Sequence, residues 1–166
     1  MMPERKGEAM KKIGLGLFIA ASIAVPIVIM IVTGGFGGGE VAGELRGSGP
    51  LVGDFTLRPD ACASGQEDGF LGVYLGAAEQ SDARLKVFQD PAYGEMVQLQ
   101  VPGSCEGPRC KQVLLKREIC ARLAVRVEKT NTTINDVRVL DGELDLDCTL
   151  ASGDRITGAV RFEGCH

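Results

Sequence analysis

The C-terminal stretch Asn135–His166, NDVRVLDGELDLDCTLASGDRITGAVRFEGCH, decides the fold class of this chain. Its apolar residues recur at every second position, which is the period of a half-buried β-strand. Asp141-Gly142 is a two-residue hairpin signal, and Ala151-Ser152-Gly153 fits a three-residue loop with glycine in the left-handed conformation. The stretch therefore predicts a three-stranded antiparallel meander. Its expected strands are Asn135–Leu140, Glu143–Leu150 and Asp154–Phe162.

The lengths of the two turns also predict which residues lie opposite each other. The expected pairs are Val139 with Leu144, Val137 with Leu146, Leu146 with Gly158, and Leu144 with Val160. A shift of one residue would turn the apolar set toward solvent. The same register places Glu143 beside Arg161 and Asp145 beside Arg138 on the polar face.

Short alternating segments separated by Gly and Pro continue through the rest of the C-terminal region. The further strand candidates are Gly53–Leu57, Phe70–Leu75, Arg84–Phe88, Met96–Val101, Gln112–Lys116 and Cys120–Val127. Lys, Arg, Leu and Ala are frequent in Cys110–Val127, so a helix is an alternative there. Apolar and polar residues alternate through residues 119–128, which favours a strand over that part. Pro108–Arg117 could hold a helical turn instead. Many short strands predict an all-β fold, an antiparallel β-sandwich or barrel-like domain.

An uncharged run of 27 residues, Ile13–Gly39, marks the N-terminal region. Its apolar part, Ile13–Val32, has 20 residues and would span about 30 Å as a helix, the thickness of a bilayer core. Four basic residues precede it, and Lys and Arg favour the cytoplasmic side. We therefore expect a cytoplasmic tail at residues 1–12 and a single-pass transmembrane helix, acting as a signal-anchor, at residues 13–33.

A cleaved signal peptide is the alternative to this anchor. The apolar region of a signal peptide is about 7–15 residues long, shorter than the run found here, although Val41-Ala42-Gly43 could serve as a poor cleavage site. We favour the uncleaved anchor and leave cleavage open. Residues 34–49 hold eight glycines in 16 positions and predict a flexible linker, followed by one extracytoplasmic β domain at residues 50–166.

Charge and composition limit the partners of the domain. From Glu40 onward there are 14 basic and 20 acidic residues, a net charge of −6, which argues against nucleic acid. The chain has no Trp and only two Tyr, Tyr74 and Tyr93, which argues against an aromatic carbohydrate-binding platform and against a base-stacking surface. The expected partners are the lipid bilayer, through residues 13–33, and a protein of the envelope. The oligomeric state stays open.

All six cysteines follow the apolar run: Cys62, Cys105, Cys110, Cys120, Cys148 and Cys165. Outside the cytoplasm, disulfides are the default interpretation, and six cysteines allow 15 connectivities. Cys105 and Cys110 flank a turn sequence, so a local bond between them is reasonable, whereas the expected register places Ile156 opposite Cys148 and disfavours Cys148–Cys165. A bond at Cys165 would hold the C-terminus in place. Neither paired zinc-ligand spacing nor Cys-x-x-Cys is present, so no metal or cofactor is expected.

No set of residues forms a recognisable catalytic site. His166 is the only histidine and the last residue, a poor place for an imidazole that must be held by a third group. Asp141, Glu143, Asp145 and Asp147 alternate along one strand face and could suggest calcium or a carboxylate pair. Neighbouring arginines favour a solvated face of ion pairs instead.

Two segments resemble small exported β-rich proteins of myxobacterium-like Gram-negative bacteria. They are Gly53-Asp54-Phe55-Thr56-Leu57 with Cys62, and Ile156-Thr157-Gly158-Ala159-Val160-Arg161-Phe162 with Cys165-His166. The resemblance implies a bacterial envelope location and a β fold, and it brings no activity and no site residues. Cys105 and Cys110 are additional to its pattern.

The sequence thus predicts a membrane-anchored extracytoplasmic (periplasmic) module for binding or envelope organisation, rather than an enzyme. Its expected location is the bacterial inner membrane, with the N-terminus in the cytoplasm and the C-terminal domain in the periplasm. Two alternatives stay open. One is an enzyme that acts on envelope material with acidic residues, and the other is a cysteine-based metal or redox protein.

Overall fold

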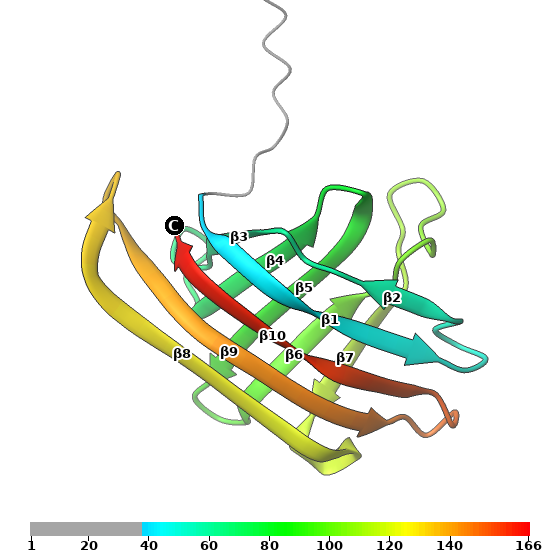
Figure 1. The fold of residues 1–166 in the computed structure, drawn as a ribbon. Helices are drawn as coiled ribbons and strands as arrows, with labels where there is room; N and C mark the ends of the chain where they lie inside the picture. Colours follow the sequence, from blue (N-terminus) through cyan, green and yellow to red (C-terminus); the bar gives the residue numbers. More distant parts are fainter. Residues whose placement is uncertain (1–37) are drawn as a thin grey trace, which may run out of the picture. The chain divides into compact units, whose positions relative to one another are not determined.

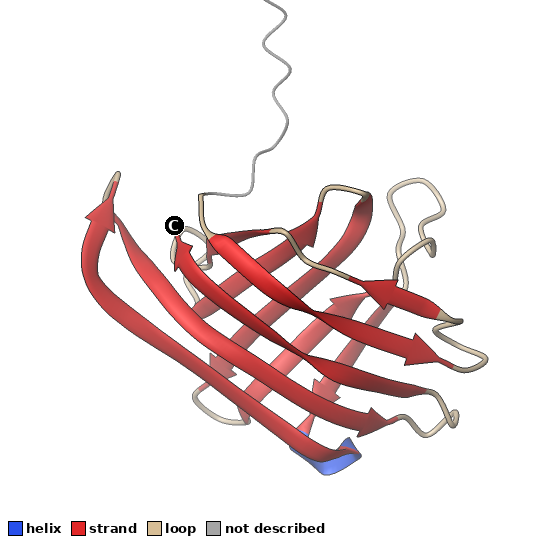
Figure 2. Cartoon of the chain, viewed as in Figure 1, coloured by secondary structure: helices blue, strands red, loops and turns tan. Residues whose placement is uncertain are grey.

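The computed structural model describes residues 38–166, which form two antiparallel β-sheets without an α-helix (Figures 1 and 2). Within these residues no helix is long and apolar enough to cross a bilayer. The expected cytoplasmic tail at 1–12, the transmembrane helix at 13–33 and the first residues of the expected linker lie outside the described residues.

Ten strands and one short 3-10 helix make up the domain. In chain order they are β1 (Glu40–Ser48), β2 (Phe55–Leu57), β3 (Ala61–Ser64), β4 (Gly72–Ala77), β5 (Gln80–Asp90), β6 (Gly94–Gln100), β7 (Gln112–Lys116), the 3-10 helix η1 (Arg117–Ile119), β8 (Cys120–Ile134), β9 (Val137–Thr149) and β10 (Arg155–Cys165). One sheet, which we name the terminal sheet, has the order β2-β1-β10-β9-β8. The other, the middle sheet, has the order β3-β4-β5-β6-β7.

The two sheets form a sandwich around one core. The strands of the terminal sheet lie across those of the middle sheet, and the end of β10 lies beside the beginning of β1 (Figure 1). Leu45, Leu144 and Phe162 of the terminal sheet, and Val73 and Leu85 of the middle sheet, are fully buried in a single hydrophobic cluster. The predicted all-β antiparallel fold is therefore confirmed, in the form of two facing sheets.

The second half of the predicted meander has the expected register. Leu146 lies opposite Gly158 and Leu144 opposite Val160 in the β9–β10 pair, and Glu143 lies opposite Arg161. Gly153 adopts a φ of +86°, as a three-residue loop with a left-handed glycine requires. Both the predicted loop and the predicted register of this strand pair are therefore confirmed.

The predicted hairpin turn at Asp141-Gly142 is wrong, because β9 runs straight through these residues. The turn between β8 and β9 lies at Asn135-Asp136, whose φ angles of 50° and 65° are those of a two-residue hairpin turn. Gly142 serves packing instead: a Cβ there would lie 2.6 Å from Cζ of Phe162 and 2.0 Å from the carbonyl oxygen of Arg126.

This change of turn overturns the pairs that depended on it. Val139 does not lie opposite Leu144, since both belong to β9, and the same holds for Val137 and Leu146. Arg138 lies opposite Thr133 rather than beside Asp145. The ion-pair partner of Asp145 is Arg122 on β8, at 2.8 Å.

The expected linker at residues 34–49 is also wrong over Glu40–Ser48, which form strand β1 between β2 and β10. Leu45 on this strand has no exposed surface and lies opposite Leu57 on one side and Gly158 on the other. Gly47 leaves room for an aromatic ring, because a Cβ there would lie 2.0 Å from Cε1 of Phe55. Glycine here permits close packing rather than flexibility.

The remaining strand predictions are confirmed, Gln112–Lys116 with the same ends and the others with shifted ends, and β3 was missed in addition to β1. Residues 119–128 are extended as part of β8, so the helix alternative is wrong there, and the helical turn occurs instead at Arg117–Ile119. Strand β3 (Ala61–Ser64) was not expected. It is short and lies at the edge of the middle sheet, so its sequence carries little of the alternation that marks a longer strand.

The position of β1 generates a test by truncation. A chain that begins at residue 38 should fold and melt cooperatively, whereas a chain that begins at residue 50 should not, because its terminal sheet lacks a central strand and the buried Leu45. Circular dichroism during thermal unfolding distinguishes the two. Equal melting temperatures for the two truncated proteins would contradict this placement of β1.

Candidate functional site

The six cysteines form three disulfides: Cys62–Cys165, Cys105–Cys110 and Cys120–Cys148. No free cysteine is left among the described residues. The expectation of structural disulfides is confirmed, including the local bond and the absence of Cys148–Cys165. Within residues 38–166, no group of three or more His, Cys, Asp or Glu side chains is placed to hold a metal ion.

The Cys62–Cys165 bond joins the two sheets at the end of the last strand. Cys62 lies on β3 and Cys165 on β10, and neither has exposed surface. The two residues are 103 positions apart in the chain. Because a disulfide restricts the unfolded chain more when its loop is long, this bond should stabilise the domain by roughly 4–5 kcal/mol.

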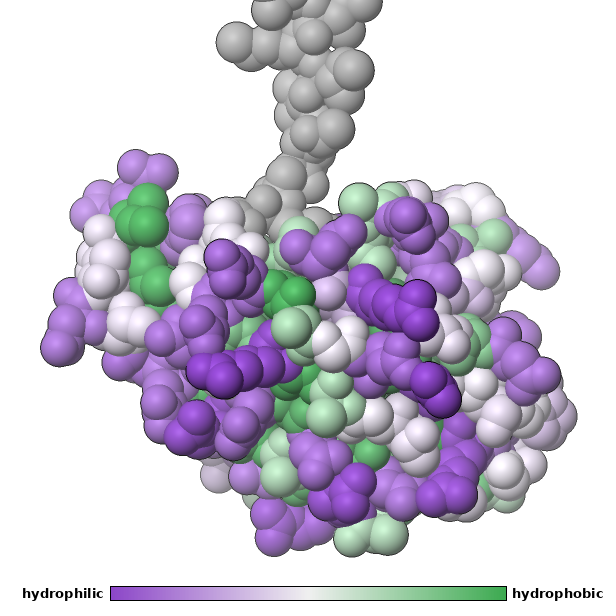
Figure 3. Space-filling view, in the orientation of Figure 1, coloured by the Kyte–Doolittle hydropathy of each residue, from purple (hydrophilic) through white to green (hydrophobic). Residues whose placement is uncertain are grey.

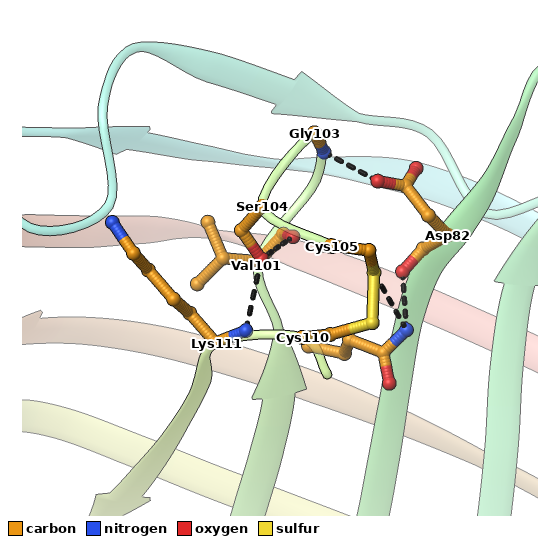
Figure 4. The surroundings of a disulfide bond; sticks show 8 residues. Asp82, Val101, Gly103, Ser104, Cys105, Cys110 and Lys111 are labelled. Atoms are coloured by element: carbon orange, nitrogen blue, oxygen red, sulfur yellow. Dashed lines mark hydrogen bonds between the residues drawn. A yellow bond between two sulfur atoms is a disulfide. The ribbon is translucent and has the colours of Figure 1, made fainter. Parts of the chain in front are cut away.

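The Cys105–Cys110 bond closes a hydrogen-bonded loop between β6 and β7 (Figure 4). The Ser104 hydroxyl donates to the carbonyl of Val101 at 2.6 Å and accepts the amide of Lys111 at 3.1 Å. The carboxylate of Asp82 accepts the amide of Gly103 at 2.6 Å. These contacts fix the backbone around the bond, and the loop as a whole is built as a structural element.

The disulfides should differ in their effect on stability. Replacing Cys62 and Cys165 together by Ala should lower the free energy of unfolding by roughly 4–5 kcal/mol, and replacing Cys105 and Cys110 together by about 2 kcal/mol, because the second loop is short. Urea titration of the two double variants measures both values. Equal losses would contradict the role assigned to the long-range bond.

The row of acidic residues on β9 forms the expected face of ion pairs. Asp145 pairs with Arg122 at 2.8 Å, Asp147 with Arg155 at 3.0 Å, and Glu143 with Arg126 at 3.4 Å, while Asp141 accepts the amide of Gly164 at 2.7 Å. Figure 3 shows this outer face of the terminal sheet, where hydrophilic side chains surround a narrow band of neutral and hydrophobic residues, coloured white to green. Hydrogen bonds from Arg155 lower the pKa of Asp147, which keeps this carboxylate charged.

His166 lies at the end of β10 and next to the beginning of the described chain. Its Nδ1 is 2.9 Å from the carbonyl oxygen of Gly164, and a Cβ at Gly38 would lie 2.7 Å from its Cε1. The ring therefore contacts backbone at the chain end. No carboxylate forms an ion pair with it among the described residues.

A buried carboxylate, Asp154, was missed by the sequence analysis. It has no exposed surface, accepts the amides of Leu51 at 2.7 Å and Val52 at 2.8 Å, and accepts the hydroxyl of Ser152. Burial by itself would raise the pKa of Asp154, but the hydrogen bonds from Ser152, Val52 and Leu51 outweigh it and lower the pKa. Asp154 thus fastens the β1–β2 loop to the β9–β10 loop.

The lowered pKa of Asp154 gives a pH dependence. The pKa of Asp154 is lower in the folded protein than in the unfolded chain, where it is about 4. The charged carboxylate therefore contributes fully to stability above the unfolded pKa, and this contribution is lost as the pH falls through the folded pKa. Asp154→Asn should therefore lower the melting temperature at pH 7, and the difference from the wild type should shrink toward pH 2. Asp136→Asn, in an exposed turn, is the control. A difference independent of pH would count against a charged Asp154.

The outer face of the middle sheet gathers most of the aromatic rings of the described domain. We name this the aromatic–lysine face and define it by Phe70, Tyr74, Lys86, Phe88, Tyr93 and Lys116. This face arises because side chains along a strand point alternately into the core and toward solvent. On β5, Leu85 and Val87 are buried, so Lys86 and Phe88 point outward, and Tyr74 lies opposite Lys86 on β4.

The rings on this face pack edge to face around one ammonium group. The ring centroid of Phe70 lies 5.1 Å from that of Tyr74 and 6.1 Å from that of Phe88. Nζ of Lys86 lies 3.9 Å from the centroid of Phe70 and 5.0 Å from that of Phe88. Nearby, Nζ of Lys116 lies 5.1 Å from the ring centroid of Tyr93, a residue that is 70% exposed. Such contacts hold the cations in place at the surface.

Tyr74 holds one side of the cluster. Its hydroxyl donates to the carboxylate of Asp68 at 2.6 Å. Partial burial and this acceptor raise the pKa of Tyr74, so the phenol stays protonated and keeps donating at neutral pH.

The two lysines of the face have no carboxylate partner among residues 38–166. All eight ion pairs found there are made by arginines, and those of the terminal sheet neutralise its acidic row. On the middle sheet Arg117 pairs with Glu95 at 3.0 Å, while the ammonium groups of Lys86 and Lys116 lie over aromatic rings. The two outer faces of the sandwich therefore differ in chemistry.

A groove crosses the aromatic–lysine face. It has a volume of about 890 Å³, and its lining combines the rings of Phe70, Phe88 and Tyr93 with charges of both signs: Lys86, Arg117, Asp90, Glu95 and Glu118. Beside it lies a smaller hollow of about 220 Å³, lined by Tyr74, Arg84, Lys86, Gln98, Gln100 and Gln112. Lys86 lines both. The face thus offers rings, charges of both signs and amide groups in two neighbouring hollows.

The sequence could have indicated part of this face. Lys86 and Phe88 alternate with Leu85 and Val87 inside a predicted strand, which places an aromatic and a cation on its outward side. Phe70 and Tyr93 lie on loops, and their approach to β5 depends on the sheet order, which the sequence did not provide. Counting aromatics over the whole chain therefore concealed their local concentration.

No protein-family model, curated protein or solved structure matches this chain at a significant level.

Proposed function

We propose that this protein is a membrane-anchored extracytoplasmic binding module, and that the aromatic–lysine face is its binding surface. The predicted anchor is the apolar run Ile13–Val32, and the expected location is the inner membrane of a bacterium with the β domain in the periplasm. Three disulfides support an oxidising compartment for the domain.

The observation that carries the proposal is the contrast between the two outer faces. On the terminal sheet, Arg122, Arg126 and Arg155 each have an acidic partner within the face itself. On the middle sheet, Lys86 and Lys116 form no ion pair among the described residues, and rings hold their ammonium groups beside a groove that Asp90, Glu95 and Glu118 also line. A concave surface that combines open rings with a few charged groups is typical of a binding site.

The start of β1 limits how far such a module could reach. Since β1 begins at Glu40, only residues 34–39 separate the predicted transmembrane helix from the sheet. Six extended residues span at most about 20 Å. Under this proposal the domain works close to the lipid surface, and its ligand would be a component of the envelope near the inner membrane.

Photo-crosslinking in intact cells, combined with protease digestion of spheroplasts, tests the proposal. A photoreactive residue at position 93, on the aromatic–lysine face, should form adducts, and one at position 161, on the terminal sheet, should form few. Protease added outside spheroplasts should digest the domain. Equal adduct formation at both positions would contradict the assignment of the binding face. Protection of the domain from the protease would contradict its periplasmic location.

A further inference from the structure

We infer that the Cys105–Cys110 disulfide is a site of reversible thiol–disulfide exchange, and that its reaction partner is a protein dithiol. Three observations about this bond lead to the inference: the length of the loop that it closes, its access to solvent, and the hydrogen bonds that hold the same loop. The exchange site goes beyond the proposed binding function and does not depend on it.

The Cys105–Cys110 bond closes the shortest loop of the three disulfides. Its cysteines are 5 positions apart, whereas those of the other two bonds are 28 and 103 positions apart. A disulfide that closes a short loop restricts the unfolded chain little and so stabilises the fold little. Because the bond and the fold stabilise each other by the same amount, folding protects this bond least against reduction.

This bond is also the most accessible of the three. Cys105 and Cys110 are both half-buried. Of the other four cysteines only Cys120 is half-buried, and its partner Cys148 has no exposed surface. A thiolate must reach a disulfide sulfur to attack it, so access limits the exchange. A dithiol can therefore reach Cys105–Cys110 while the domain stays folded, whereas each of the other bonds contains at least one fully buried cysteine.

Hydrogen bonds hold the loop closed independently of the disulfide. The amide of Glu106 donates to the carbonyl of Arg109 at 2.7 Å, and the amide of Arg109 donates back to the carbonyl of Glu106 at 3.3 Å. At the base of the loop the amide of Val101 donates to the carbonyl of Lys111 at 3.0 Å, and the hydroxyl of Ser104 bridges the same two residues (Figure 4). These contacts keep the two thiols close together after reduction, so that the bond can form again.

Gln100 determines which sulfur leaves. Its Nε2 lies 3.8 Å from Sγ of Cys105 and 2.5 Å from the carbonyl oxygen of Asp82. An N–H group beside a sulfur stabilises the thiolate, and the thiol of lower pKa leaves faster. The attack is therefore directed to Sγ of Cys110. Gln100 also lines the hollow beside Lys86, so the exchange site adjoins the proposed binding surface.

The exchange takes place in two steps. In the first, a thiolate of the partner dithiol attacks Sγ of Cys110, the bond to Cys105 breaks, and Cys105 leaves as a thiolate that takes up a proton. In the second, the other thiol of the partner loses its proton and attacks the partner's own sulfur in the mixed disulfide, which releases Cys110 as a thiolate that takes up a proton. Two electrons pass to the loop, the partner becomes a disulfide, and the reverse sequence oxidises the loop again.

Differential alkylation of the full-length chain in mild detergent tests the inference. The folded protein is incubated with excess reduced thioredoxin as the protein dithiol, its thiols are blocked with N-ethylmaleimide, and mass spectrometry identifies the blocked cysteines. Cys105 and Cys110 should become blocked at least about tenfold faster than any other cysteine, because the other bonds react only when the structure opens. Circular dichroism should show that the reduced protein is still folded, and excess oxidised thioredoxin should restore the bond.

Two variants on β6 test the assignment of the leaving sulfur. Gln100→Ala should slow the exchange by about twofold to tenfold, because the N–H group beside Sγ of Cys105 is lost. A purely structural role of Gln100 predicts the opposite, since loss of its contact with Asp82 would loosen the loop and speed the exchange. Gln98→Ala is the matched control: Gln98 lies two positions earlier on the same strand and donates to Gln112, so this variant should react as the wild type does.

The outcomes separate the exchange site from the direction of attack. Equal rates of blocking for all six cysteines, or earlier blocking of Cys120 and Cys148, would overturn the exchange site. Blocking of Cys105 and Cys110 only together with loss of the folded circular dichroism signal would overturn it as well. Faster exchange in Gln100→Ala would overturn the direction of attack and leave the site in place.

Discussion

The pairing of β1 with β10 is the constraint on which the rest of the structure depends. Every other neighbouring pair of strands is consecutive in the chain, so the strands would form an open meander without it. The pairing runs from Glu40 opposite Glu163 to Ser48 opposite Arg155 and places both ends of the described chain in the middle of one sheet. It therefore gives β1 and β10 a hydrogen-bonded neighbour on each side and leaves β2 and β8 as the edges of the terminal sheet.

Two further contacts secure this closure at opposite ends of β10. Cys165 at its end is bonded to Cys62 of the middle sheet, and Asp154 just before its beginning binds the amides of the β1–β2 loop. The disulfide acts chiefly by restricting the unfolded chain, whereas the carboxylate satisfies buried backbone donors. The disulfide thus joins the terminal sheet to the middle sheet, and the carboxylate joins two loops within the terminal sheet.

The alternation and the loop after Leu150 predicted the class of fold and half of the C-terminal meander, because period and turn length are local properties. The sequence was misleading at glycines. Gly142 and Gly47 were interpreted as turn and linker residues, yet each lies within a strand where the ring of Phe162 or Phe55 occupies the space of a Cβ. Such a role depends on which strands pair and in which register, and neither glycine reveals that by its local sequence. The candidate site was hidden for the same reason, since the sheet order gathers its rings.

Hydrogen–deuterium exchange tests the placement of β1 most directly. Backbone amides of residues 42–47 that are paired in the sheet should exchange as slowly as those of β10, because a central strand opens only with much of the domain. Exchange of residues 42–47 at the rate of an unstructured chain, with β10 still protected, would contradict the account and restore this segment to a flexible linker.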